Sequence, residues 1–220
     1  MSARIAVGVL AVAAAAAAAI ALLRSGPETS GDFDYYTLAL SWSPTWCQTE
    51  GRSEGARQCE GRPRAFVLHG LWPQHERGWP DSCYSGERPW VPERVIDNMI
   101  DIMPGKGLII HQYAKHGTCS GLPPEDYFDA ARKAFDSVRV PKRFQRLDRP
   151  LEVTPEEVES AFLKENPALR ADMLSVTCGP KRLREVRICF SKDLEPTACG
   201  PNEDQARLCR RPRVRVPPVQ

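Results

Sequence analysis

The sequence contains no Cys-x-x-Cys pair, no internal repeat and only four histidines in 220 residues. Without closely spaced cysteines, the zinc-ribbon and thioredoxin-like classes lose their main support. The formal net charge is only +2, so the overall charge does not indicate a nucleic-acid-binding protein. Any affinity for phosphate must therefore come from a local cluster of side chains.

One long apolar run stands at the N-terminus. Arg4 is followed by an alanine-rich stretch over residues 5–23 that only Gly8 interrupts. This pattern is typical of an export signal, although its length would also allow an uncleaved membrane anchor. We expect residues 1–24 to be a signal peptide or anchor, and the protein to be secreted or periplasmic.

Eight cysteines follow this segment, and an even number in an exported chain favours disulfides over free thiols. They are Cys47, Cys59, Cys83, Cys119, Cys178, Cys189, Cys199 and Cys209. Four bridges would each contribute about 2–4 kcal/mol to stability. Their spacing alone does not decide which cysteines pair.

Hydrophobic patterning predicts strands near both ends of one domain. Four stretches have the alternating or short apolar character of strands, namely residues 35–42, 65–69, 173–177 and 183–190. The last two are separated by a turn and suit an antiparallel pair. A basic, proline-bearing segment over residues 210–220 follows, and we expect it to be a flexible tail.

Helical patterns fill the middle of the chain. Apolar residues recur at helical spacing between Pro92 and Met103, and residues 108–118 and 124–138 also suit helices. A capping-box pattern starting at Thr154 predicts a further helix to about residue 164. We therefore expect one disulfide-stapled α+β domain, with a mainly antiparallel sheet packed against several helices.

Three of the four histidines fall in two short segments. His69 lies in residues 66–74, whereas His111 and His116 lie in residues 111–119. On a helix, His111, Gln112, Lys115 and His116 would share one side, which would then carry only hydrogen-bond donors and cations. Such a face suits an anionic ligand such as phosphate.

Histidine suits proton transfer because its ordinary pKa, about 6.5, lies close to working pH. If His69 faces the second segment, one imidazole could accept a proton and another could donate one at the same phosphodiester. RNA would supply the nucleophile through its own 2′-hydroxyl, and the first product would be a 2′,3′-cyclic phosphate. This chemistry needs no cofactor and no metal.

The two segments closely resemble the paired active-site motifs of the ribonuclease T2 family. The likeness rests on His-Gly-Leu-Trp-Pro over residues 69–73 and Lys-His-Gly-Thr-Cys over residues 115–119, and it extends over residues 33–209. It implies a metal-independent endoribonuclease that cleaves single-stranded RNA to 3′-phosphate ends. By this resemblance His116 would be the general base, His69 the general acid, and His111 with Lys115 would hold the phosphate.

The resemblance also implies disulfide pairs and substrate contacts. The pairs would be Cys47 with Cys59, Cys83 with Cys119, Cys178 with Cys209, and Cys189 with Cys199. Trp72 would stack on a base, and Gln74, Leu108 and Ser41 are further candidate substrate contacts. Gln74 and Leu108 depart from residues that many relatives carry, so we expect low base specificity.

One motif position departs from the family pattern. Gln112 stands where the family usually has a glutamate, and an amide can orient a group but cannot give up a carboxyl proton. We expect weakened or pH-shifted activity rather than none.

Three alternatives remain open. The chain could be an RNA-binding or partner-binding module that has lost its chemistry. It could be a metal-dependent phosphodiesterase, although we find no carboxylate cluster near the motifs. A zinc site of His111, His116 and Cys119 would need a free thiolate. We expect a monomer that binds single-stranded RNA but not DNA, with no stable membrane contact unless the N-terminal segment is retained.

Overall fold

The computed structural model describes residues 30–51, 57–60 and 62–219, so the expected signal or anchor segment lies outside the described part. Within that part, no helix is both long and apolar enough to cross a bilayer.

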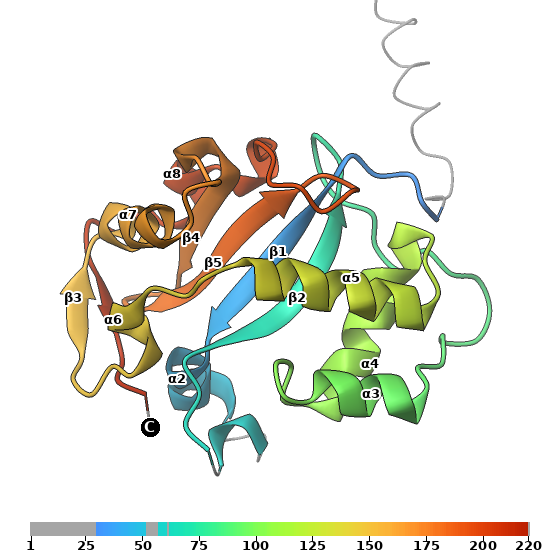
Figure 1. The fold of residues 1–220 in the computed structure, drawn as a ribbon, viewed down its shortest axis with the longest axis horizontal. Coiled ribbons are helices and arrows are strands. Elements are labelled where there is room, and N and C mark those ends of the chain that lie inside the picture. The colour runs from blue at the N-terminus through green and yellow to red at the C-terminus, as the bar shows by residue number, and fades with distance from the viewer. Residues whose placement is uncertain (1–29, 52–56, 61, 220) are drawn as a thin grey trace, which may run out of the picture.

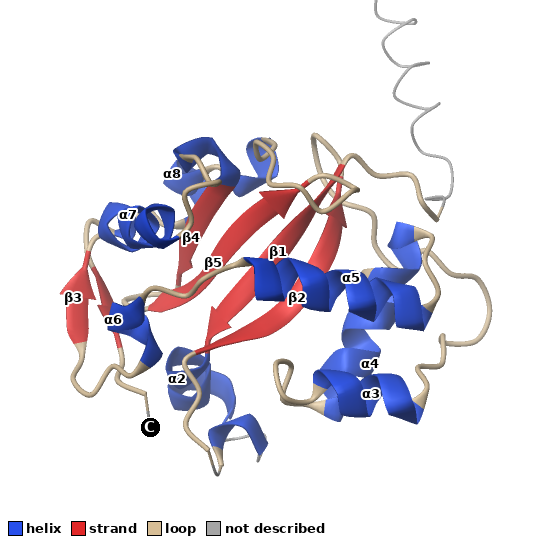
Figure 2. Ribbon diagram, in the orientation of Figure 1, coloured by secondary structure: helices blue, strands red, loops and turns tan. Residues whose placement is uncertain are grey.

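A four-stranded antiparallel sheet runs through the molecule in the order β2-β1-β5-β4 (Figures 1 and 2). Its strands are β1 (Tyr35–Trp42), β2 (Phe66–Gln74), β4 (Leu174–Cys178) and β5 (Leu183–Phe190). All four predicted strands are therefore present, but β2 continues five residues beyond its predicted end at His69. It includes Pro73, which an edge strand can accommodate because one side of its backbone needs no ladder partner.

Helices flank this sheet. The longer ones are α3 (Glu93–Met99), α4 (Lys106–Lys115), α5 (Pro124–Ser137) and α7 (Pro155–Glu165). Shorter ones are α2 (Ser43–Trp46), α6 (Lys142–Gln145) and α8 (Gln205–Leu208). The capping box that begins α7 is complete, since Thr154 Oγ1 accepts from the Glu157 amide and the Glu157 carboxylate accepts from the Thr154 amide.

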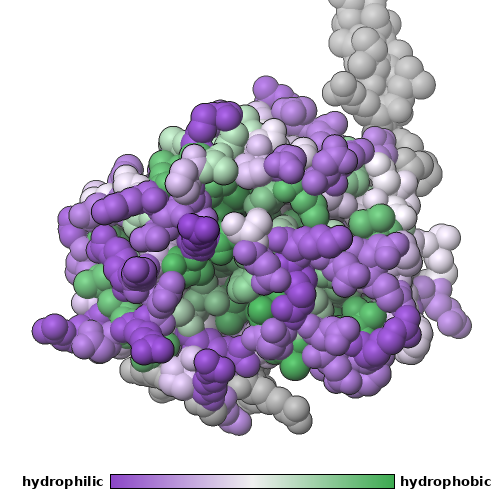
Figure 3. Space-filling model, in the orientation of Figure 1, coloured by the Kyte–Doolittle hydropathy of each residue, from purple (hydrophilic) through white to green (hydrophobic). Residues whose placement is uncertain are grey.

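The two faces of the sheet differ in polarity. One face is apolar and belongs to the core, with Leu38 opposite both Leu71 and Ile188, and Leu40 opposite Val186. Helix α5 crosses this face over β1 and β2, while α7 packs on β4 (Figure 1). Figure 3 shows hydrophilic residues over these helices, with hydrophobic surface between them where the sheet lies beneath. The opposite face is polar and carries side chains of the candidate functional site.

The C-terminal segment differs from the sequence-based expectation. Residues 210–220 were expected to form a flexible tail, but Val214–Val216 form β6, which pairs antiparallel with β3 (Leu151–Val153). Val214 and Val216 are fully buried, and the Trp42 indole donates to the Pro217 carbonyl at 3.1 Å. Alternating valines bury one side of the strand while the arginines face solvent, so a run rich in arginine can still be ordered.

All eight cysteines are paired, as the resemblance implied. The bridges join Cys47 to Cys59, Cys83 to Cys119, Cys178 to Cys209, and Cys189 to Cys199. The second of them ties the loop after the first histidine segment to the end of the second.

Candidate active site

His69 lies at an irregularity in β2. Ala39 of β1 is opposite Gly70 while its neighbour Leu40 is opposite Leu68, so His69 is an extra residue with no partner on β1. A bulge of this kind turns a side chain out of the regular alternation. It gives His69 a half-exposed position on the polar side of the sheet.

The His69 ring is hydrogen-bonded to a buried carboxylate. Its Nδ1 lies 2.6 Å from Glu185 Oε1, and Glu185 projects from β5, across β1. Burial would raise the pKa of the Glu185 carboxyl, but the hydrogen bond and charge of His69, together with Arg187, lower it to about 2. Because the ionised carboxylate can only accept, Nδ1 carries the proton and Nε2 is the atom left to face a substrate.

The second segment is partly helical. Helix α4 begins at Lys106 and ends at Lys115, two residues before its predicted start and three before its predicted end. His116 caps it, and Gly117–Ser120 continue as a 3-10 turn. A Cβ on Gly117 would lie only 2.4 Å from the Tyr113 ring, so this tight turn has no room for a side chain. His116 is thus the C-cap of α4 and not one of its helical residues.

One indole connects the two histidine segments. The Trp72 ring centroid lies 5.0 Å from that of His69 and 5.3 Å from that of His116. Its Nε1 donates to Gln112 Oε1 at 2.7 Å. The two imidazoles from distant parts of the chain thus contact the same side chain, and Gln112 holds that side chain in place.

Gly70 is required by this packing. A Cβ built there would lie 2.2 Å from Gln112 Oε1 and 2.3 Å from Trp72 Nε1, which is well inside contact distance. Any larger residue would push apart the hydrogen-bonded indole and amide.

Burial and neighbouring cations favour the neutral form of the other two histidines. Desolvation and the Lys115 charge lower the pKa of His116 to about 3, and the same two causes, followed by Arg88, lower the pKa of His111. His116 Nδ1 is buried and has no hydrogen-bond partner among the described residues. A buried ring nitrogen without a partner is costly, and such groups often have a catalytic role.

Lys115 remains accessible beside these rings. Its Nζ lies 3.5 Å from Asp81 Oδ2, and its backbone carbonyl accepts from the Ser82 amide at 2.8 Å. With the Cys83–Cys119 bridge, these contacts attach the loop after the first segment to the end of α4.

A cleft of about 1070 Å³ opens beside His69 and His111. Leu108 and Ser41, two of the expected substrate contacts, line it. Its other walls include Trp46, Gln58, Arg64, Ile100 and Lys106, none of which we had selected from the sequence.

Two expected base-binding residues, Trp72 and Gln74, do not line this cleft. Trp72 is only 9% exposed, because its ring is packed against His69, His116 and Arg187, and it has little surface left for stacking on a base. Gln74 is also buried, with its Oε1 accepting from Asn202 Nδ2 at 3.3 Å. The zinc alternative loses its thiolate, since Cys119 is bound to Cys83.

Glu185 and Arg187 are two further site residues that sequence analysis missed. The available signal was their alternation with Val186 and Ile188 in a predicted strand, which placed two opposite charges on one side of it. Nothing local indicates that this side faces His69, which is 116 residues earlier.

Comparisons with known proteins show which family the chain resembles. The family model described as the Ribonuclease T2 family matches residues 33–199. A ribonuclease of Aeromonas hydrophila is 42% identical over 102 residues, 46% of this chain and 45% of that protein. A probable ribonuclease of Haemophilus influenzae is 29% identical over 188 residues, 79% of this chain and 64% of that protein. The chain thus matches less than two thirds of the length of both relatives.

Two further matches extend over more of the partner protein. Ribonuclease I of Escherichia coli (strain K12) is 28% identical over 206 residues, 74% of this chain and 77% of that protein. An RNase-related protein from Calystegia sepium has a similar fold, with a TM-score of 0.66 at 22% identity over 86% of this chain and 98% of that one. Because the family model covers well over half of the chain, the chain belongs to the ribonuclease T2 family.

Proposed function

We propose that this protein is a metal-independent endoribonuclease that cleaves single-stranded RNA through a 2′,3′-cyclic phosphate. The observation that carries the proposal is the convergence of His69 and His116 on the Trp72 indole, with Lys115 beside them. Two imidazoles and one cation are the groups that transphosphorylation by an internal hydroxyl requires.

The proton transfers follow from the state of each ring. His116, whose pKa is lowered to about 3, is neutral at working pH and accepts the proton of the 2′-hydroxyl. The 2′-oxygen then bonds to phosphorus as the bond to the 5′-oxygen breaks. His69 Nε2 gives its proton to that leaving oxygen, and Lys115 with His111 stabilises the negative charge that develops on the phosphate. Water later opens the cyclic product to a 3′-phosphate.

Base specificity is expected to be low. The cleft beside His69 offers Leu108 and Ile100 as apolar surfaces, and contact with such surfaces does not distinguish one base from another. Arg64 and Lys106 on its walls can contact phosphates, which also carry no sequence information.

The test is cleavage of single-stranded RNA by the oxidised protein in excess EDTA, with product ends identified by mass spectrometry. Cyclic phosphate ends are expected, and a DNA strand of the same sequence should stay intact because it lacks the 2′-hydroxyl. No cleavage of RNA would favour a binding module, and activity that requires added divalent metal would favour a metal-dependent phosphodiesterase. Either result would overturn the proposal.

The same assay tests the two proton-transfer residues. His69→Phe and His116→Phe should each lower kcat by at least about a hundredfold, the lower range for loss of a general acid or base. His75→Phe is the matched control, because this fourth histidine lies in the loop after β2 and, unlike His69 and His116, has no ring contact with Trp72 among the described residues. Equal rates for His75→Phe and His116→Phe would contradict the assignment.

We also infer that the protein acts outside the cytoplasm as a monomer. Four disulfides persist in oxidising compartments, and the apolar N-terminal run is typical of an export signal. Mass analysis of the exported protein would show whether residues 1–24 are removed, and light scattering would give its oligomeric state. Accumulation of the reduced protein in the cytoplasm would contradict the proposed location.

A further inference from the structure

A row of charged side chains lies on the polar face of the sheet behind His69. In register, Glu185 of β5 is opposite Ser41 of β1 and Thr177 of β4, and Arg187 is opposite Ala39 and Ser175. Ala39 and its other partner, Gly70, are small, so the long side chains of β5 can extend across them toward β2. Charges buried on a central strand are costly unless each has a partner.

Each oxygen of Glu185 has a separate partner. Oε1 accepts from His69 Nδ1 at 2.6 Å and from Ser41 Oγ at 3.2 Å. Oε2 accepts from Arg187 Nε at 3.0 Å. With both oxygens engaged, the carboxylate cannot rotate away from His69, and its side chain is only 9% exposed.

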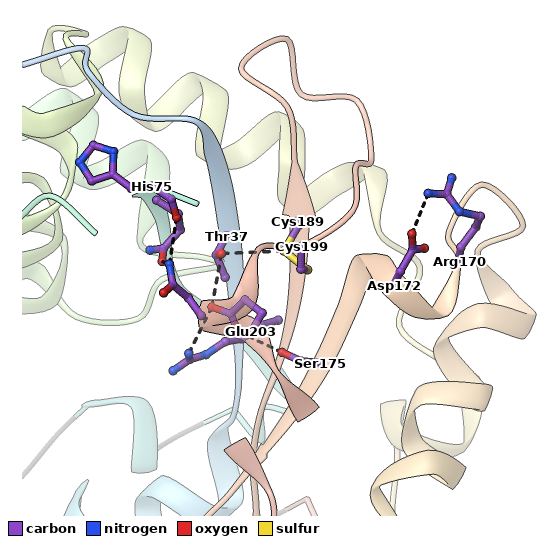
Figure 4. The surroundings of a disulfide bond; sticks show 11 residues. Thr37, His75, Arg170, Asp172, Ser175, Cys189, Cys199 and Glu203 are labelled. Atoms are coloured by element: carbon purple, nitrogen blue, oxygen red, sulfur yellow. Dashed lines mark hydrogen bonds and ion pairs between the residues drawn. A yellow bond between two sulfur atoms is a disulfide. The ribbon is translucent and has the colours of Figure 1, made fainter. Parts of the chain in front are cut away.

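Arg187 is held in turn by a second buried carboxylate. Its Nη1 lies 3.4 Å from Glu203 Oε1, while Glu203 Oε2 accepts from Ser175 Oγ at 3.0 Å. Figure 4 shows Glu203 between Thr37 and Ser175, next to the Cys189–Cys199 bridge. The arginine also lies over the Trp72 ring, 5.0 Å from its centroid.

We propose that Glu185, held by Arg187 and Glu203, is a positioning residue that fixes the orientation and protonation of the His69 ring. The hydrogen bond keeps the proton on Nδ1, turns Nε2 toward the leaving 5′-oxygen and stabilises the imidazolium that the acid role requires. This inference rests on the proposed role of His69 as general acid, and it assigns no contact between Glu185 and RNA.

Other charges also face His69, and they act in the opposite direction. Lys115 of α4 is cationic and disfavours a positive charge on His69, whereas the lowered pKa values of His111 and His116 favour the neutral form of both rings. Arg187 lies beyond Glu185 and is shared with Glu203. Glu185 is therefore the anion on which the imidazolium depends.

The experiment compares Glu185→Gln and Glu185→Ala with the parent protein. The amide keeps hydrogen bonds to Ser41 and Arg187 but loses the charge, so we expect kcat to fall about tenfold with little change in KM. The alanine should lower kcat by about a hundredfold, toward the loss expected without the acid. In Glu185→Gln the alkaline limb of the pH–rate profile should move about one unit to lower pH, because the imidazolium has lost its anion.

A second measurement does not depend on activity. Ring ¹⁵N chemical shifts should show His69 protonated at Nδ1 in the parent, and a mixture of the two neutral tautomers in Glu185→Ala. Arg184→Gln is the matched control, since Arg184 is a charged residue of the same strand whose side chain is exposed. It should change neither the tautomer nor the profile.

The outcomes separate the two proposals. If the parent forms cyclic phosphate but Glu185→Gln has the parental profile and tautomer, the positioning role is wrong and the ribonuclease proposal stands. If the parent forms no cyclic phosphate, the proposed function fails, and a parental tautomer in Glu185→Ala would then overturn the orienting role as well. A folded Glu185→Ala with altered KM alone would also contradict the inference.

Discussion

At the scale of single residues, burial determines the protonation state of the His116 ring. Desolvation and Lys115 lower the pKa of its ring to about 3, with Asp81 acting in the opposite direction and His69 and His111 adding to the decrease. A ring that stays neutral in mild acid can accept a proton under conditions in which a free histidine would already be charged.

This gives a prediction for the pH dependence of cleavage. Because the base must be neutral, kcat/KM should remain high as the pH falls and decline only between about pH 4 and pH 3, following the lowered pKa of His116. Cleavage of poly(U), whose bases do not titrate in this range, is the measurement. An acidic limb centred near pH 6.5 would show that the base has an ordinary histidine pKa.

Gln112 gives a second prediction at this scale. Its Oε1 accepts from the Trp72 indole, so a glutamate in its place can keep that bond and bring a negative charge near His111, Lys115 and His116. We expect Gln112→Glu to raise kcat/KM by about tenfold, a modest part of the range for an added acid–base group.

The matched control for that change is Gln74→Glu. Gln74 is also a buried glutamine of this region, but it bonds to Asn202 rather than to the indole. Gln74→Glu should not raise activity. If Gln112→Glu had the parental rate and pH profile, the identity of residue 112 would be immaterial to catalysis.

At the scale of secondary-structure elements, the end of α4 depends on its covalent attachment. The Cys83–Cys119 bridge joins the 3-10 turn after His116 to the loop that follows β2, where Ser82 also donates to the Lys115 carbonyl. This attachment limits how far the turn can move from His69.

Removing the bridge should therefore cost both stability and activity. Cys83→Ser combined with Cys119→Ser is expected to lower the unfolding free energy by about 3–4 kcal/mol, or Tm by roughly 10 °C, and kcat about tenfold or more. Calorimetry and RNA cleavage at 25 °C are the measurements. Removing the Cys178–Cys209 bridge is the control, since it closes a loop of similar length and should cost about 3–4 kcal/mol without a matching loss of kcat.

For the molecule as a whole, the C-terminal segment completes the fold. Strand β6 buries Val214 and Val216 beside β3, and the Pro217 carbonyl accepts from the indole of Trp42, the last residue of β1. The last residues of the chain thus support a strand that lies next to the site.

The prediction is that this short strand contributes measurably to stability. Val214→Ala combined with Val216→Ala should lower the unfolding free energy by about 3–5 kcal/mol, because each valine is fully buried. Arg215→Ala, on the exposed side of the same strand, should change it by less than about 0.5 kcal/mol. Urea titration of the oxidised protein is the measurement. If the double valine variant and Arg215→Ala lowered the unfolding free energy equally, the C-terminal segment would be a tail that does not contribute to the fold.

Local sequence patterns determined much of the secondary structure of this protein and indicated its family. Alternating apolar residues predicted β1 and β5, the capping box predicted α7, and the resemblance around His69 and His116 implied both the family and the four bridges. These signals lie within short windows, where propensity and motif spacing act directly.

The tertiary structure alone decided what surrounds the histidines. It placed Glu185 against His69, buried Gln112 and Trp72 instead of exposing them, and ordered the strand around Val214. The physical reason is that burial, hydrogen-bond partners and pKa shifts depend on side chains more than a hundred residues apart, which no periodicity within one segment can report.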